Sequence, residues 1–382
     1  MAFNLEAEAA RLISVGFHGK SVSDDLSRLL ARGVGGVILF SRNVGNPTET
    51  FETTSSIKRR AGRPILVALD QEGGKVARLR DGFSQLPSMR ALGETGSSSL
   101  AREVGAMIGR ELRAVGFDMN YAPVLDIDTN PENPVIGSRS FGRTPELVSE
   151  FGVALAAGLE SVGVAACGKH FPGHGDTSQD SHLNLPRLSH PLERLEQIEL
   201  APFRAAIAAG IPALMTAHVI FDALDPSYPA TMSRAVLHDL LRQRMDYHGL
   251  IVTDDLEMRA IADHFGVEDA VVRGLGAGVD QFLCCHNAEI AHRAIDAVVH
   301  AAERNSLSRE ALTAANRRLQ AFSARYARPA LDQPALSLLR CDAHLALIAR
   351  VSSGAAGEST SPAGTDPTAV MQQISAETAG RG

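Results

Sequence analysis

Eight apolar runs alternate with longer segments of helical period over the first 330 residues, and this alternation constrains the fold more than any other feature. The runs are mostly continuous instead of alternating with polar residues, which is typical of parallel strands covered on both faces. They lie at 15–19, 35–40, 65–70, 118–128, 164–171, 213–219, 250–255 and 279–285. This number of helix–glycine–strand units predicts an α/β fold with a single (β/α)₈ TIM-type barrel. A doubly wound open sheet is the alternative, but no GxGxxG turn follows the first run.

Polar residues stand at the ends of several of these runs, where a barrel of this kind carries its chemistry. They are Asp70, Asp126, Asp128, Lys169, His170, His218, Asp254 and Asp255. We therefore expect a functional site at the carboxyl ends of the strands.

The last part of the chain has a different composition. We expect one barrel domain over residues 1–345 and a low-complexity, disordered tail over 346–382. From Val351 onward the sequence is rich in Ser, Thr, Ala and Gly and has no apolar period. Such a segment cannot bury enough surface to offset the entropy lost on ordering.

Charge and composition exclude several classes of partner. The net charge of −7 and the pI near 6.0 argue against a basic surface for nucleic acid. No run of about 18 apolar residues predicts a membrane span, and the N-terminus has no basic region followed by an apolar one. The four cysteines show no CxxC spacing, which favours free thiols in a reducing cytoplasm.

One stretch, KHFPGHGDTSQDSHLNLP at 169–186, crowds histidines and aspartates between glycines and a proline. His170, His174 and Asp176 form an HxxxHxD pattern, and zinc sites do use such ligands with one position open for water. The intervening proline and glycine, however, exclude a helix that would place both imidazoles on one face. We expect no metal here, and a metal site remains the alternative.

Two other patterns favour acid–base chemistry. Asp180 lies two residues before His182, so in an extended segment the carboxylate can accept the imidazole N–H and fix the tautomer. The segment IVTDDLEM (251–258) ends an apolar run in paired aspartates that should point to opposite sides. We expect Asp254 to face the site and Asp255 to cap the following helix. A carboxylate nucleophile with a separate proton donor is the arrangement of retaining glycosidases.

Five stretches together resemble glycoside hydrolase family 3, with similarity from about residue 10 to 330. They are ALDQEGGKVARLR (68–80), NYAPVLDID (120–128), NPVIGSRSFG (133–142), KHFPGHGDTSQDSHLNLP (169–186) and IVTDDLEM (251–258). The resemblance is strongest to the single-barrel bacterial β-N-acetylglucosaminidases of peptidoglycan recycling. Too few residues follow 330 for the second α/β domain of many family 3 β-glucosidases.

This resemblance implies roles for individual residues. Asp254 corresponds to the family's nucleophile, His182 to the acid/base of this subgroup and Asp180 to the group that orients the histidine. Residues that hold the hydroxyls of the terminal sugar would be Asp70, Arg78, Arg139, Lys169 and His170. Residues that shape the catalytic loop or border the pocket would be His174, Asp176 and His286.

The sequence thus predicts a cytoplasmic, cofactor-free, retaining exo-β-N-acetylglucosaminidase acting on GlcNAc–anhydro-muramyl peptides, as a monomer or weak dimer. The absence of tryptophan and the presence of only four tyrosines favour a pocket for one sugar over a long aromatic groove. The alternatives are a phosphorylase of the same family, a β-glucosidase, or a non-catalytic sugar-binding relative. A metal-dependent hydrolase would use His170, His174, Asp176 and Asp254.

Overall fold

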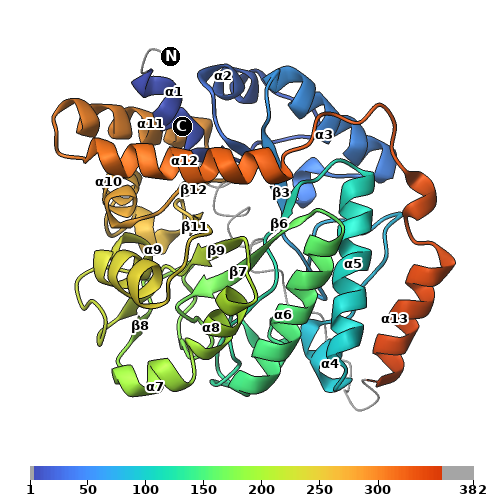
Figure 1. Cartoon of the computed structure of the whole chain (residues 1–382). Helices are drawn as coiled ribbons and strands as arrows, with labels where there is room; N and C mark the ends of the chain where they lie inside the picture. The colour runs from blue at the N-terminus through green and yellow to red at the C-terminus, as the bar shows by residue number, and fades with distance from the viewer. Residues whose placement is uncertain (1–3, 355–382) are drawn as a thin grey trace.

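The computed structural model describes residues 4–354. Among these residues, eight parallel strands close into a barrel in the order β1-β12-β11-β9-β7-β6-β3-β2, and helices surround it (Figure 1). The strands are β1 (Ile13–Val15), β2 (Gly36–Leu39), β3 (Leu66–Leu69), β6 (Met119–Asn120), β7 (Ala165–Phe171), β9 (Ala213–Thr216), β11 (Leu250–Asp255) and β12 (Gln281–Cys284). Each overlaps one of the apolar runs, so the predicted (β/α)₈ fold is confirmed.

The first strand begins earlier than the sequence predicts. Strand β1 ends at Val15, whereas the apolar run suggested a strand over 15–19. Gly16 follows it directly and lies against the neighbouring strand β12. A Cβ atom there would sit 2.0 Å from the carbonyl oxygen of Cys285, so only glycine lets the chain pass this close.

The helices follow the strands as expected, with one interruption. Ser23 accepts the N–H of Leu26 at 3.1 Å and thus caps α2, as its position predicts. The segment 192–210 forms two helices, because Pro202 lacks an N–H and is tolerated only in the first turn of a helix. The α-helices are α1 (Leu5–Arg11), α2 (Asp24–Arg32), α3 (Pro47–Ala61), α4 (Met89–Glu94), α5 (Ser98–Ala114), α6 (Pro145–Ser161), α7 (Leu192–Gln197), α8 (Ala201–Ala208), α9 (Arg259–Ala262), α10 (Val267–Ala277), α11 (Ala288–Glu303), α12 (Arg309–Tyr326) and α13 (Asp342–Gly354).

Shorter elements complete the connections. The π-type helix η4 (Ala235–Arg244) occupies the helical position before β11. The single-turn 3₁₀ helices are η1 (Ser41–Asn43), η2 (Gly137–Arg139), η3 (Ala230–Met232) and η5 (Leu336–Leu338). Two small sheets lie outside the barrel, formed by β4 (Gln71–Gly73) with β5 (Val76–Ala77) and by β8 (Arg187–Leu188) with β10 (Ile220–Phe221).

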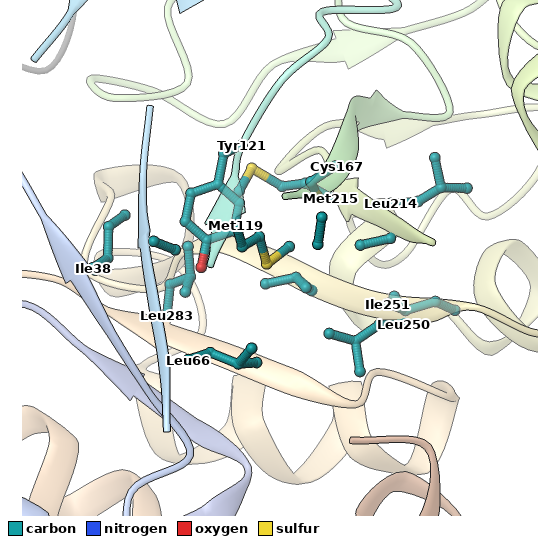
Figure 2. Packing of buried hydrophobic residues seen from close by; sticks show 14 of the residues in the cluster. Ile38, Leu66, Met119, Tyr121, Cys167, Leu214, Met215, Leu250, Ile251 and Leu283 are labelled. Carbon is teal, nitrogen blue, oxygen red and sulfur yellow. The ribbon is translucent and has the colours of Figure 1, made fainter. Parts of the chain in front are cut away.

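The barrel interior is filled by apolar side chains contributed by different strands. Figure 2 shows Ile38 of β2, Met119 of β6 and Leu283 of β12 meeting there. Burying each such side chain contributes about 1.5–3 kcal/mol. The barrel interior is therefore a packed core, and Ile38 and Leu283 also line the cavity at the strand ends.

The C-terminal segment differs from the prediction. Helix α13 runs alongside α5 (Figure 1) and is anchored by the buried carboxylate of Glu111. That carboxylate accepts the backbone N–H of Arg340 at 2.9 Å and lies 2.8 Å from Nδ1 of His344. The expected disorder from residue 346 is therefore wrong for 346–354, and residues 355–382 lie outside the described part. Within residues 4–354, no helix combines the length and apolar composition that crossing a bilayer requires.

Candidate active site

The strand ends surround a cavity of about 680 Å³, a volume that includes its opening to the solvent. Seven predicted site residues line it: Asp70, Arg78, Arg139, Lys169, His170, His182 and Asp254. The eighth, Asp180, is not among the lining residues, but it contacts His182, which is. The structure therefore brings together residues that are far apart in the sequence.

A network of buried charges forms one wall of the cavity. Its centre is Glu72, which sequence reasoning assigned no role. Oε1 and Oε2 of Glu72 accept bonds of 2.8 Å each from Nη2 and Nε of Arg139, and Nζ of Lys169 lies 2.6 Å from Oε1. Burial raises the pKa of Glu72, but the two cations outweigh it and hold that pKa well below its usual range. Glu72 therefore stays ionised and holds the side chains of Arg139 and Lys169 in position.

Asp70 extends this network toward the other side of the cavity. Its carboxylate accepts a bond of 2.7 Å from Nζ of Lys169 and one of 3.3 Å from Nη2 of Arg78. Burial raises the pKa of Asp70, but these cations outweigh it and lower the pKa. Burial likewise lowers the pKa of Lys169, and Asp70 and Glu72 outweigh it and raise the pKa. Asp70 and Lys169 therefore remain charged at neutral pH and offer a strong acceptor and a strong donor.

His170 is oriented by Asp126, which follows β6. Nδ1 of His170 lies 2.6 Å from Oδ2 of Asp126, whose carboxylate also accepts the backbone N–H groups of His170 and His174. Burial raises the pKa of Asp126, but His170 outweighs it and the pKa is lowered. Because Nδ1 faces a carboxylate, Nε2 is the ring nitrogen left for a ligand.

His182 and Asp180 form the expected pair. Nδ1 of His182 lies 2.7 Å from Oδ1 of Asp180, and the same oxygen accepts the backbone N–H of His182 at 2.8 Å. Burial raises the pKa of Asp180, but its bonds to His182 and the attraction of that ring outweigh this and lower the pKa. Asp180 therefore stays ionised, keeps the Nδ1 proton in place and stabilises a positive charge on the imidazole.

The loop between β7 and β8 carries this pair, and His174 holds the loop in place. Both ring nitrogens of His174 are engaged, with Oγ1 of Thr177 at 2.8 Å and Oγ of Ser181 at 2.9 Å. Burial, and then the nearby His170, lowers the pKa of His174 to about 4. His174 is thus a neutral structural group, as the resemblance implied for this loop.

Gly173, Gly175 and Asp176 also help to fix the conformation of this loop. Gly173 has a φ of +139°, and a Cβ at Gly175 would lie 1.7 Å from the carbonyl oxygen of Ile127. Asp176 turns away from the cavity to Nε2 of His190 at 2.5 Å and to Arg194 at 3.2 Å. The residues of the HxxxHxD pattern therefore contact separate partners, and among residues 4–354 no three His, Cys, Asp or Glu side chains are grouped as metal ligands would be.

Asp254 is the last residue but one of β11, and it lines the cavity. Oδ1 accepts the N–H of Asp255 at 2.8 Å. Burial raises the pKa of Asp254, but the imidazoles of His170, His218 and His182 outweigh it, so the pKa is lowered. An ionised carboxylate at the cavity wall is what a nucleophile requires.

The expected capping role of Asp255 is wrong. Helix α9 begins after Met258, which makes no side-chain cap, and the Asp255 carboxylate lines the cavity instead. Its Oδ1 accepts the N–H groups of Glu257 at 3.1 Å and Cys285 at 3.2 Å. The ladder between β11 and β12 shifts register between Val252 and Asp255, which turns both aspartates toward the site.

The sequence of the barrel matches a known family. A family model described as the glycosyl hydrolase family 3 N-terminal domain matches residues 4–322. The chain belongs to this family. The match covers the whole barrel and ends within α12, so helix α13 lies beyond it.

Relatives agree on the class of activity. Beta-hexosaminidases of Nitrosomonas eutropha and Thiobacillus denitrificans are 43% identical over 264 residues and 42% identical over 274 residues. These alignments cover 68% and 70% of this chain and 75% and 76% of the relatives. The chain is thus a glycoside hydrolase, a β-N-acetylhexosaminidase.

Solved structures of family 3 enzymes superpose on the chain. A glycoside hydrolase family 3 beta-N-acetylglucosaminidase from Paenibacillus sp. str. FPU-7 gives a TM-score of 0.90 at 42% identity, covering 93% of this chain and 69% of that one. NagZ from Neisseria gonorrhoeae gives 0.74 at 32% identity, covering 90% and 98%. The barrel thus has the fold of these family 3 enzymes.

Sequence reasoning missed some contributors to the site. Glu72 lies two residues after Asp70, so the alternation of side chains along an extended segment indicates that both face the same way. His218 was seen only as a strand-end residue; its Nε2 lies 3.0 Å from the carbonyl oxygen of Asp255. His286, expected to border the pocket, does line it.

Proposed function

We propose that this family 3 hydrolase is a retaining exo-β-N-acetylglucosaminidase that works through a covalent glycosyl-aspartate intermediate. The observation that carries this proposal is the cavity in which ionised Asp254 and the Asp180–His182 pair meet the charged wall. We further propose that the substrates are GlcNAc–anhydro-muramyl peptides of peptidoglycan recycling, acted on in the cytoplasm. The resemblance to the single-barrel enzymes of that process supports this choice.

In the first step, an oxygen of Asp254 attacks the anomeric carbon of the terminal sugar. The bond from that carbon to the leaving oxygen breaks, and the oxygen keeps the electron pair. It takes the proton from Nε2 of the cationic His182, whose Nδ1–H remains bonded to Asp180. The positive charge of the imidazolium is thereby removed as the aglycone leaves.

In the second step, His182 acts as a base. Its neutral Nε2 takes a proton from water, whose oxygen attacks the anomeric carbon and displaces the Asp254 carboxylate. The configuration at the anomeric carbon is inverted in each step, so the product has the configuration of the substrate. Asp180 accepts from Nδ1 throughout, so the imidazole does not need to turn over between the steps.

The charged wall provides the sugar-binding side of the site. We assign Asp70, Arg78, Arg139, Lys169 and His170 to the hydroxyls of the terminal sugar. A hydroxyl both donates and accepts, and this set offers cationic donors beside carboxylate acceptors. Because each group is already held by a partner within the protein, little ordering is required when the sugar binds.

The test is hydrolysis of 4-nitrophenyl β-N-acetylglucosaminide by the wild type and by Asp254→Asn. Without a nucleophile, we expect kcat to fall on the order of 10⁴-fold or more. Asp239→Asn is the matched control, because Asp239 lies on the surface and its contact is to His238. A slowly turned-over fluorinated analogue should add one sugar mass to the peptide that contains Asp254.

Two additions distinguish the alternatives. Phosphate stimulation with a sugar 1-phosphate product would assign the enzyme as a phosphorylase of the family. Loss of turnover with a chelator would favour a metal-dependent hydrolase. Unchanged activity of Asp254→Asn, or no wild-type turnover, would refute the proposal.

A further inference from the structure

His286 follows β12 and lines the same cavity as Asp254, but the proposed reaction gives it no role. Only 8% of the residue is exposed. Its ring lies 5.7 Å from the ring of Phe40, centroid to centroid, at an interplanar angle of 31°. The imidazole is therefore a buried polar group in the wall of the substrate cavity.

The backbone that carries His286 is held by two carboxylates. Oε1 of Glu257 accepts the N–H groups of His286 at 2.7 Å and Asn287 at 3.2 Å. Oδ1 of Asp255 accepts the N–H of Cys285 at 3.2 Å. These three bonds fix the position from which the His286 side chain projects.

The two ring nitrogens of His286 have different surroundings. Nε2 lies 3.3 Å from Oδ2 of Asp255, which favours the tautomer with the proton on Nε2. Nδ1 then carries the lone pair. It is buried and has no hydrogen-bond partner among residues 4–354. Buried polar atoms are nearly always paired in folded proteins, so an atom of this kind in a site wall calls for a ligand.

We propose that His286 is a specificity-determining residue whose Nδ1 accepts a hydrogen bond from the bound substrate. The donor is a hydroxyl or amide N–H, on either the terminal sugar or the aglycone. This inference rests on the proposed function, because it uses the same cavity and the same substrate. It adds a hydrogen-bond acceptor on the β12 side of the site, whereas Arg139 and Lys169 offer cationic hydrogen-bond donors.

The test compares variants across substrates that differ in one donor. His286→Leu removes the acceptor, and His286→Asn keeps a side-chain oxygen near the position of Nδ1. The substrates are 4-nitrophenyl β-N-acetylglucosaminide, its 3-, 4- and 6-deoxy analogues, 4-nitrophenyl β-glucoside and N,N′-diacetylchitobiose. We expect His286→Leu to lose about 10-fold in kcat/KM on every substrate that carries the donor, and His286→Asn to regain most of it.

The pattern of losses identifies the donor. If the loss disappears with one 4-nitrophenyl analogue, the group missing from that analogue is the donor. If it is confined to the disaccharide, the donor is on the aglycone. His300→Leu is the control, because the His300 side chain is exposed, pairs with Glu303 and has no role in the proposed reaction. Circular dichroism checks that each variant is folded.

Two results would overturn the proposal, and they differ. An equal loss on all substrates, or no loss on any, with a folded His286→Leu variant would show that His286 serves only the structure. No turnover of any substrate by the wild type would refute the proposed function, and this contact with it.

Discussion

Replacing Glu72 by glutamine removes one negative charge from the buried wall and keeps the shape of the side chain. Arg139 would lose two charge-assisted bonds and Lys169 one. A glutamine oxygen can replace one of these acceptors, but its NH₂ group would face donors. The buried set would then hold three cations, Arg78, Arg139 and Lys169, and only one carboxylate, that of Asp70.

The magnitude follows from burial. The side chains of Glu72, Arg139 and Lys169 are 1%, 6% and 3% exposed, so water cannot replace the lost charge. Removing one partner of a buried ion pair costs about 3–5 kcal/mol in the free energy of unfolding. Glu103→Gln is the matched control, because Glu103 and its partner Arg350 are 49% and 55% exposed. A surface pair of this kind contributes less than about 1 kcal/mol.

Urea unfolding followed by far-UV circular dichroism measures both variants; the chain has no tryptophan to report by fluorescence. We expect Glu72→Gln to lower the free energy of unfolding by several times the amount seen for Glu103→Gln. Equal effects of the two variants would refute the reasoning that Glu72 compensates buried cations.

Asp180→Asn should lower kcat/KM about 10²–10⁴-fold on 4-nitrophenyl β-N-acetylglucosaminide, because His182 loses the charge that stabilises its cation. The loss should shrink with a 2,4-dinitrophenyl leaving group, which departs without a proton; an equal loss would contradict the role. His174 gives a pH prediction. Burial lowers its pKa to about 4 from an ordinary 6.5, so the unfolded chain binds a proton there that the folded chain does not. Its contribution to stability is present above pH 6.5 and is lost as the pH falls toward 4, by up to about 3 kcal/mol. Urea titrations across this range should show a weaker pH dependence for His174→Gln, and identical slopes would count against the assignment.

The fold could be predicted because each barrel strand is a local pattern of apolar residues. The same pattern indicated that Asp70, Lys169 and Asp254, near strand ends, would lie at the cavity. The contacts within the site could not be predicted in this way. Arg139 reaches Glu72 across 67 residues and Lys169 reaches Asp70 across 99, and no local pattern records such pairs.

The direction of the Asp255 side chain could not be predicted from the sequence for a different reason. Alternation of side chains along a strand predicts that Asp254 and Asp255 point apart. One extra residue in the ladder between β11 and β12 cancels that rule locally, and sequence alone does not indicate where a bulge falls. Helix α13 was missed for a related reason, because its anchor on Glu111 is a contact across more than 200 residues.

The charged wall also bears on how such an enzyme can change. Two carboxylates and three cations share their bonds in one buried set, formed by Asp70, Glu72, Arg78, Arg139 and Lys169. A single substitution there leaves a charge without its counterpart before any new sugar preference can arise. A change in the preferred sugar would therefore require several of these charged residues to be substituted together, so that their charges still balance. Libraries that aim to alter the preferred sugar should therefore vary these positions together, while the β12 side, where His286 stands, can be varied one residue at a time.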